Sequence, residues 1–251
     1  MEKQEQKQIV GLDEFDTTVS LWQLLPAGAG RGLHRLKTIV NSIHNGQVKQ
    51  SLKPLSLLIA GKQGLRTHAR CVLRAWGLER PGELPAHLLQ STADEIFNFF
   101  SPSQMADSHI ISSVSLLYPA ILKTLYEVVS TGEFSKYDNI RKTTEVVPVF
   151  SPIVMTTNAK DNVPTYFQQK IDHIVELEDY SEQQLQLIVL QRLKYCNLDY
   201  EEEKVLQLIV EYGLEKLHNI IRLLKSSITV MLADSRTTLT VEDIKTVMAY
   251  S

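Results

Sequence analysis

The chain has 251 residues, a length that predicts one large domain or one domain with a smaller companion. Hydrophobic residues make up 43% and charged residues 22% of the sequence, which excludes a disordered, collagen-like or coiled-coil chain. The 26 basic and 29 acidic residues give a formal net charge of −3. This balance argues against a global positive field that would attract nucleic acid.

The sequence also bears on membranes, metals and compartment. No run approaches the ~18 apolar residues of a membrane span, and the polar start MEKQEQKQ predicts no secretory signal. The two cysteines, Cys71 and Cys196, are far apart, and the seven histidines show no HxxxH or HExxH spacing. We therefore expect a cytoplasmic protein without a disulfide framework or a metal site.

Residues 1–32 are predicted to be an N-terminal tail followed by a flexible segment. Gly28, Gly30 and Gly32 form a GxGxG pattern within it. The dinucleotide-binding fingerprint is GxGxxG after a strand, and neither condition is met here. A glycine-rich loop is the better interpretation.

The segment 33–178 is predicted to be an α/β core. Its expected elements run in chain order: a helix at 33–44, a strand at 54–60, a glycine-containing loop and a helix at 69–76, a helix at 93–100, a strand at 109–111, a helix at 116–129, and strands at 148–155 and 171–177. Strands that alternate with helices predict a parallel sheet with helices on both faces.

The segment 179–251 is predicted to be a small all-helical domain, or lid. Ser181 and Gln184 form a capping box, and apolar stripes at helical spacing follow it. Gly213 is expected to end the second helix as a C-cap. Thr240 to Asp243 is expected to cap a short last helix.

This order of elements resembles the AAA+ ATPases, whose P-loop core carries a helical lid. The resemblance covers about residues 33–250. It is strongest to the Holliday-junction branch-migration motors (the RuvB family) and next to clamp-loader subunits. It rests on the strand–loop–helix at 54–76, a later strand that ends in Thr-Thr-Asn, and the helical C-terminal segment.

In that family the first loop is a Walker A motif. Its backbone amides hold the phosphates, its lysine neutralises their charge, and its serine or threonine hydroxyl binds Mg²⁺. In the best register Ala60 stands at the first glycine position, and Leu65, Arg66 and Thr67 stand at the last three. Gly61 and Gly64 lie in the loop between and are the remaining candidate nucleotide-binding residues. Thr67 can supply the hydroxyl. Arg66 replaces the lysine, and Leu65 replaces a glycine, so that a side chain obstructs the phosphate.

The family's Walker B motif ends the next strand with two acidic residues. At the matching positions this sequence has Ser112 and Ser113, which cannot serve as an anionic metal ligand or as a carboxylate base. Asp107 precedes the strand and does not replace them.

The remaining family positions are also incomplete. Asn158 matches the polar sensor 1, although a turn-forming asparagine is an alternative. Gln168 and Gln169 stand in the region of the trans-acting arginine, with Lys170 as the one cation nearby. Lys216 stands where sensor 2 has an arginine, and a solvated residue of the lid is an equal alternative.

Two other constellations favour ordinary explanations. Arg66, Arg70 and Arg74 are spaced by four, which suits either an anion-binding surface or, more simply, a solvated helix face. His109 near the serines at 112–113 lacks the GxSxG elbow of a nucleophile, so a polar strand end is expected.

The sequence therefore predicts a degenerate AAA+ protein that acts as a structural or regulatory subunit of a DNA-processing or other AAA+ assembly. The expected partner is another AAA+ subunit or a second copy of the chain, with DNA contact indirect or weak. No cofactor is required; ATP or ADP with Mg²⁺ would bind if the site retains affinity. The alternative is an active or nucleotide-switched ATPase of the helicase or clamp-loader type with atypical Walker motifs.

Overall fold

The computed structural model of this chain describes residues 31–44, 53–78, 80–85, 93–100, 106–138, 142–213 and 216–250. These residues form two compact units, which divide between Glu178 and Asp179. Of the predicted tail at 1–32, residues 1–30 lie outside the described part, as do Gly28 and Gly30. Arg31 and Gly32 already belong to the first helix.

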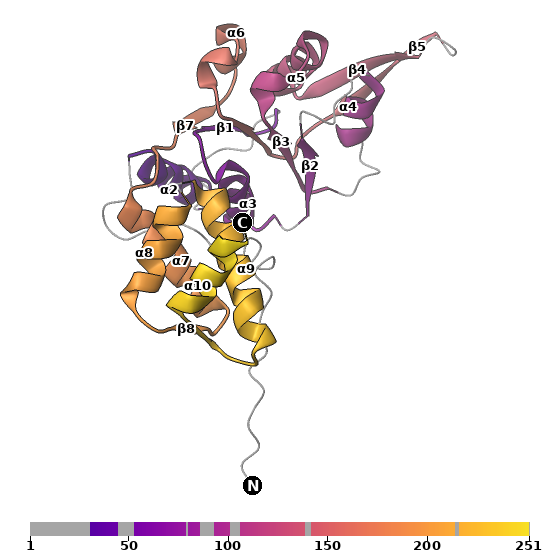
Figure 1. The fold of residues 1–251 in the computed structure, drawn as a ribbon. Coiled ribbons are helices and arrows are strands. Elements are labelled where there is room, and N and C mark those ends of the chain that lie inside the picture. Colours follow the sequence, from indigo (N-terminus) through magenta and orange to yellow (C-terminus); the bar gives the residue numbers. More distant parts are fainter. Residues whose placement is uncertain are drawn as a thin grey trace. The chain divides into compact units, whose positions relative to one another are not determined.

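The first unit is built on a five-stranded parallel sheet with the order β2-β3-β6-β1-β7 (Figure 1). The strands are β1 Ser56–Ala60, β2 Pro81–Pro85, β3 Ser108–Ser112, β6 Ile153–Thr157 and β7 His173–Glu176. Every residue of β1 and β6 is buried. Such continuous burial requires cover on both faces of the sheet.

Helices provide that cover. Helices α2 (Arg31–His44) and α3 (Leu65–Ala75) lie on one face, and α4 (Ala93–Phe100) and α5 (Pro119–Thr131) lie on the other (Figure 1). Short helical turns complete the unit at η4 (Val114–Leu116), η5 (Lys160–Asn162) and α6 (Thr165–Gln168). The predicted parallel sheet with helices on both faces is confirmed.

Strand β2 was not expected, because its sequence Pro-Gly-Glu-Leu-Pro resembles a loop. It pairs with β3 alone and forms an edge of the sheet. Proline is tolerated at a sheet edge because the missing N–H need not face a neighbouring strand. Strand β2 carries Glu83, which lines the cavity described below.

An antiparallel hairpin was also missed. Strands β4 (Glu133–Asp138) and β5 (Thr143–Pro148) pair with each other and extend away from the sheet (Figure 1). The predicted strand over 148–155 is therefore wrong in extent. Its first residue ends β5, whereas β6 begins at Ile153.

The second unit is helical, as predicted. Helices α7 (Glu182–Tyr195), α8 (Glu203–Tyr212), α9 (Leu217–Ala233) and α10 (Val241–Ala249) enclose one apolar core. Both predicted caps are present, from Ser181 to Gln184 and from Thr240 to Asp243. Two-residue strands, β8 (Asp199–Tyr200) and β9 (Thr238–Leu239), pair in parallel and were not expected.

Gly213 ends α8, but in a right-handed conformation (φ −66°) and not as a left-handed cap. The reason for glycine is space. A Cβ atom at Gly213 would lie 2.3 Å from Cγ1 of Ile220.

Among the helices of the described residues, none combines the length and apolar character needed to cross a bilayer.

Candidate functional site

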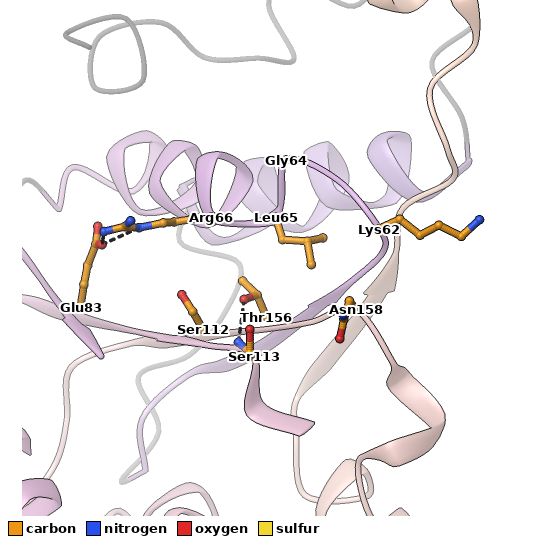
Figure 2. A pocket seen from close by; sticks show the side chains of 9 residues that line it. All are labelled: Lys62, Gly64, Leu65, Arg66, Glu83, Ser112, Ser113, Thr156 and Asn158. Carbon is orange, nitrogen blue, oxygen red and sulfur yellow. Dashed lines mark hydrogen bonds and ion pairs between the residues drawn. The ribbon is translucent and has the colours of Figure 1, made fainter. Parts of the chain in front are cut away.

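The candidate site lies at the carboxyl edge of the parallel sheet, where ligands of open α/β sheets bind. Strands β1, β3 and β6 end at this edge, and α3 begins there. The ends enclose a cavity of about 360 Å³ (Figure 2). Its walls are formed by Lys62, Gly64, Leu65, Arg66, Glu83, Ser112, Ser113, Thr156 and Asn158.

The loop between β1 and α3 has the course that a phosphate-binding loop requires. Strand β1 ends at Ala60, and α3 begins at Leu65, after four intervening residues. Gly64, between them, has a left-handed conformation (φ 68°, ψ 11°), which suits glycine. No side chain caps α3, so the amides of its first turn have no side-chain acceptor.

Gly61 fixes the start of this loop. Its amide donates to the carbonyl oxygen of Thr157 at 3.1 Å. A Cβ atom on Gly61 would lie 3.1 Å from the carbonyl oxygen of Leu177 and 3.3 Å from Cδ2 of Leu65. The close approach explains glycine at this position, although Gly61 does not line the cavity.

His68 supports the same loop through a side-chain hydrogen bond that the sequence did not predict. Its Nδ1 lies 2.8 Å from the carbonyl oxygen of Gly64. Burial lowers the pKa of His68, while the hydrogen bond to Gly64 opposes that shift. A neutral ring that donates from Nδ1 therefore stabilises the loop. Its position four residues after Gly64, one helical turn along the chain, is the signal that could have identified this contact.

The Walker A positions differ in where their side chains lie. Leu65 points into the cavity, whereas Arg66 extends away from the loop toward Glu83 (Figure 2). Thr67 follows in the first turn of α3 and is not among the residues that line the cavity. Lys62 lies at the rim and points outward (Figure 2).

The end of β3 contributes hydroxyl groups to the cavity. Ser112 is the last residue of the strand, and Ser113 follows it with a left-handed φ of 59°. The amide of Ser113 donates to Oγ1 of Thr156, 3.3 Å away (Figure 2). Neutral hydroxyls are weak substitutes for the carboxylates that hold Mg²⁺.

Glu83 is the one carboxylate among the described residues that line the cavity. Sequence reasoning missed it, because the two prolines beside it hid strand β2. Its oxygens accept from Arg66 and Arg70, so it does not offer a free metal ligand. The described residues contain no group of three or more His, Cys, Asp or Glu side chains placed to bind a metal ion.

The remaining predicted positions differ in their surroundings. Asn158 follows β6, is exposed and lines the cavity. The Gln168 side chain donates to the carbonyl oxygens of Val163 at 2.7 Å and of Lys160 at 3.2 Å. It therefore has a structural role within its own unit. Lys216 is exposed at the N-cap of α9 in the helical unit.

The arrangement suits a phosphate better than a metal ion. Uncapped helix amides and the Arg66 guanidinium are groups that hold phosphate oxygens. Leu65 reduces the space beside those amides. Arg66, however, is bound by Glu83, and the end of β3 offers no carboxylate to Mg²⁺.

No protein-family model matches the sequence, and no curated protein matches it either. Solved structures do match. The RuvB Holliday-junction branch-migration motor of Thermotoga maritima superposes with a TM-score of 0.69 over 94% of this chain and 73% of that chain, at 15% identity. A single-residue variant of that motor gives 0.68 over 88% and 70%, at 14% identity.

These similarities confirm the fold predicted from the sequence. The chain has the fold of the AAA+ ATPases and is similar to the branch-migration motor over nearly its whole length.

Proposed function

We propose that this chain is a noncatalytic AAA+ module that acts as a structural or regulatory subunit of a DNA-processing or other AAA+ assembly. Its working parts are the core at 33–178 and the lid at 179–251, and its setting is the cytoplasm. The observation that carries the proposal is the pair Ser112 and Ser113 at the end of β3, inside the cavity.

The chemistry explains why this pair matters. Phosphoryl transfer depends on charges placed around the phosphates and Mg²⁺. A carboxylate positions the metal, and a second carboxylate orients the attacking water. Ser112 and Ser113 supply neither charge. Leu65 further obstructs the phosphate position, and Gln168 supplies no cation for a neighbouring site.

A protein partner is supported by apolar side chains near the same edge of the sheet. Leu116 is 63% exposed and Tyr118 57% exposed, on the segment that follows β3. Tyr166 on α6 is 51% exposed, and its ring centroid lies 5.5 Å from that of Tyr126. Large apolar groups in solvent favour an interface with a second protein.

The partner is proposed to be another AAA+ subunit or a second copy of this chain. The resemblance implies that nucleotide sites lie between subunits, at this edge of the core. A formal net charge of −3 gives no general attraction to DNA, so DNA contact is proposed to be indirect or weak.

The test isolates the tagged full chain from its native cells under mild conditions, and identifies and counts the associated proteins by mass spectrometry. We expect an AAA+ partner with intact Walker motifs, or several copies of this chain. ATP hydrolysis by the isolated complex should not change when Thr67→Ala is introduced here. A chain that is monomeric without such a partner, or a complex that Thr67→Ala inactivates, would contradict the proposal.

The second candidate is an ATPase or nucleotide switch with atypical Walker motifs. The uncapped N-terminus of α3 beside a cavity of about 360 Å³ favours it. Titration with labelled ATP and ADP, with and without Mg²⁺, tests this candidate. Saturable binding supports the switch, whereas no binding at millimolar nucleotide excludes it.

A further inference from the structure

Glu83 lies in the cavity wall opposite the start of α3. It extends from β2, and its side chain is only 18% exposed. Among the described residues that line the cavity, Lys62 and Arg66 are the cations, and Lys62 points outward (Figure 2). Arg66 is therefore the lining cation that is placed to bind a phosphate at the start of α3. Its side chain is instead directed at Glu83.

The contacts of Glu83 are those of an anion bound by two guanidinium groups. Its Oε2 accepts from Nε of Arg66 at 2.8 Å and also from Nη2 of the same side chain. Its Oε1 accepts from Nε of Arg70 at 2.5 Å. The fork of donors on Arg66 fits a carboxylate and a phosphate in the same way.

The electrostatics agree with a charged carboxylate at this place. Burial raises the pKa of Glu83, but the hydrogen bonds and positive charges of Arg70 and Arg66 lower it below its usual value. The carboxylate is thus ionised at neutral pH. A phosphate that approached Arg66 would have to displace this carboxylate and would meet its negative charge.

We propose that Glu83 is an internal counterion that occupies the phosphate-binding donors of Arg66 and so lowers the affinity of the cavity for polyphosphate ligands. The proposal rests on the proposed function, because Arg66 stands at the phosphate-binding position of the AAA+ loop. It adds a second cause of weak phosphate binding besides the altered Walker motifs, because Glu83 lies on β2, a strand that the sequence did not predict.

The same geometry explains why Arg66 is not equivalent to the family's lysine. Arg66 and Arg70 are four residues apart on α3 and face the same carboxylate. A point charge on a flexible stem could leave Glu83 for a ligand more easily than a guanidinium that donates to it from both Nε and Nη2. Polyphosphate binding would therefore begin with the opening of the contact between Arg66 and Glu83.

The experiment titrates the full chain with sodium tripolyphosphate in EDTA by isothermal calorimetry. This probe lacks a nucleobase, and EDTA removes divalent metal ions. The titration therefore reports only on the groups of the protein that bind phosphate. The variants are Glu83→Gln, the double variant Glu83→Gln with Arg66→Gln, and Glu176→Gln. Glu176 is the matched control, because it is an ion-paired glutamate of the same unit, bound to Lys160, outside this cavity.

We expect Glu83→Gln to bind tripolyphosphate about fivefold more tightly than the wild type, the upper range for an ion pair whose Arg66 side chain is 60% exposed. The double variant should lose the gain, and Glu176→Gln should change the affinity less than about twofold. Equal affinity of Glu83→Gln and wild type overturns the proposal. A gain that Glu176→Gln or the double variant reproduces overturns it as well.

A second measurement keeps the test decisive if Glu83→Gln does not fold, as judged by circular dichroism. Arg66→Gln alone should then change tripolyphosphate affinity less than about twofold, because Glu83 already occupies Arg66. A loss of about fivefold would show that Arg66 is free to bind and would contradict the proposal. ATP hydrolysis by the wild type would refute the proposed function but leave this comparison intact, so the two failures are distinguishable.

Discussion

His109 is a buried ionisable residue whose ring lacks a hydrogen-bond partner for Nδ1. The ring packs against two aromatic side chains that also contact each other, with its centroid 4.8 Å from those of Phe99 and Phe100. Burial lowers the pKa of His109 to about 4, although Asp107 opposes the shift. The folded protein therefore keeps this ring neutral at a pH where an exposed histidine would be charged.

From the lowered pKa of His109 we predict that the protein loses stability in mild acid. Between pH 6.5, near the pKa of an unfolded-chain histidine, and the folded value of about 4, the unfolded state binds a proton that the folded state does not. The free energy of unfolding must therefore fall as the pH falls through this window. From pH 7 to pH 5 we expect His109 to remove about 2 kcal/mol.

Urea denaturation at pH 7 and pH 5 measures the effect. His109→Gln should reduce the pH-dependent loss, because glutamine gains no proton. The control is His34→Gln, at an exposed position on α2. If the wild type and His109→Gln lose equal stability between the two pH values, this explanation is wrong.

At the scale of elements, the turn from β9 into α10 depends on one buried carboxylate. Asp243 is 3% exposed and accepts from the amide of Thr240 at 2.9 Å and from its hydroxyl at 2.8 Å. It also binds Arg236, at 2.5 Å for Oδ1 and 3.0 Å for Oδ2. The capping box and the ion pair thus share one side chain.

We predict that Asp243→Asn lowers the free energy of unfolding by about 2 kcal/mol, because its amide group would face donors that now meet a carboxylate. Thermal unfolding followed by circular dichroism measures the change. Asp234→Asn is the matched control. Asp234 binds the same Arg236, but its side chain is 63% exposed, so we expect less than about 0.5 kcal/mol. Similar losses in both variants would contradict the role given to burial.

The elements also show which local signals suffice for prediction. Capping boxes at Ser181 and Thr240, and apolar stripes between them, identified the helical unit because these signals act within one turn. Strand β2 was not predicted, because its prolines are acceptable only at a sheet edge. The sequence does not reveal which strand lies at an edge. The hairpin β4–β5 was not predicted, because β5 is mostly exposed and so lacks the buried apolar face that marks a strand in a sequence.

At the scale of the molecule, the candidate site was predictable in part. The segments that carry Gly64, Ser112 and Asn158 line one cavity because parallel strands end at a common edge. Glu83 was not predictable, since its place depends on the order of strands in the sheet and not on spacing along the chain. The ion pair with Arg66 follows from the same long-range arrangement.

The central claim is that an AAA+ fold is present without the charges that hydrolysis requires. Steady-state ATP hydrolysis by the purified chain in Mg²⁺, beside Thr67→Ala, tests it most directly. We expect the two proteins to show the same background rate, far below that of ordinary enzymes. Turnover of roughly 1 s⁻¹ or faster that Thr67→Ala abolishes would contradict the claim.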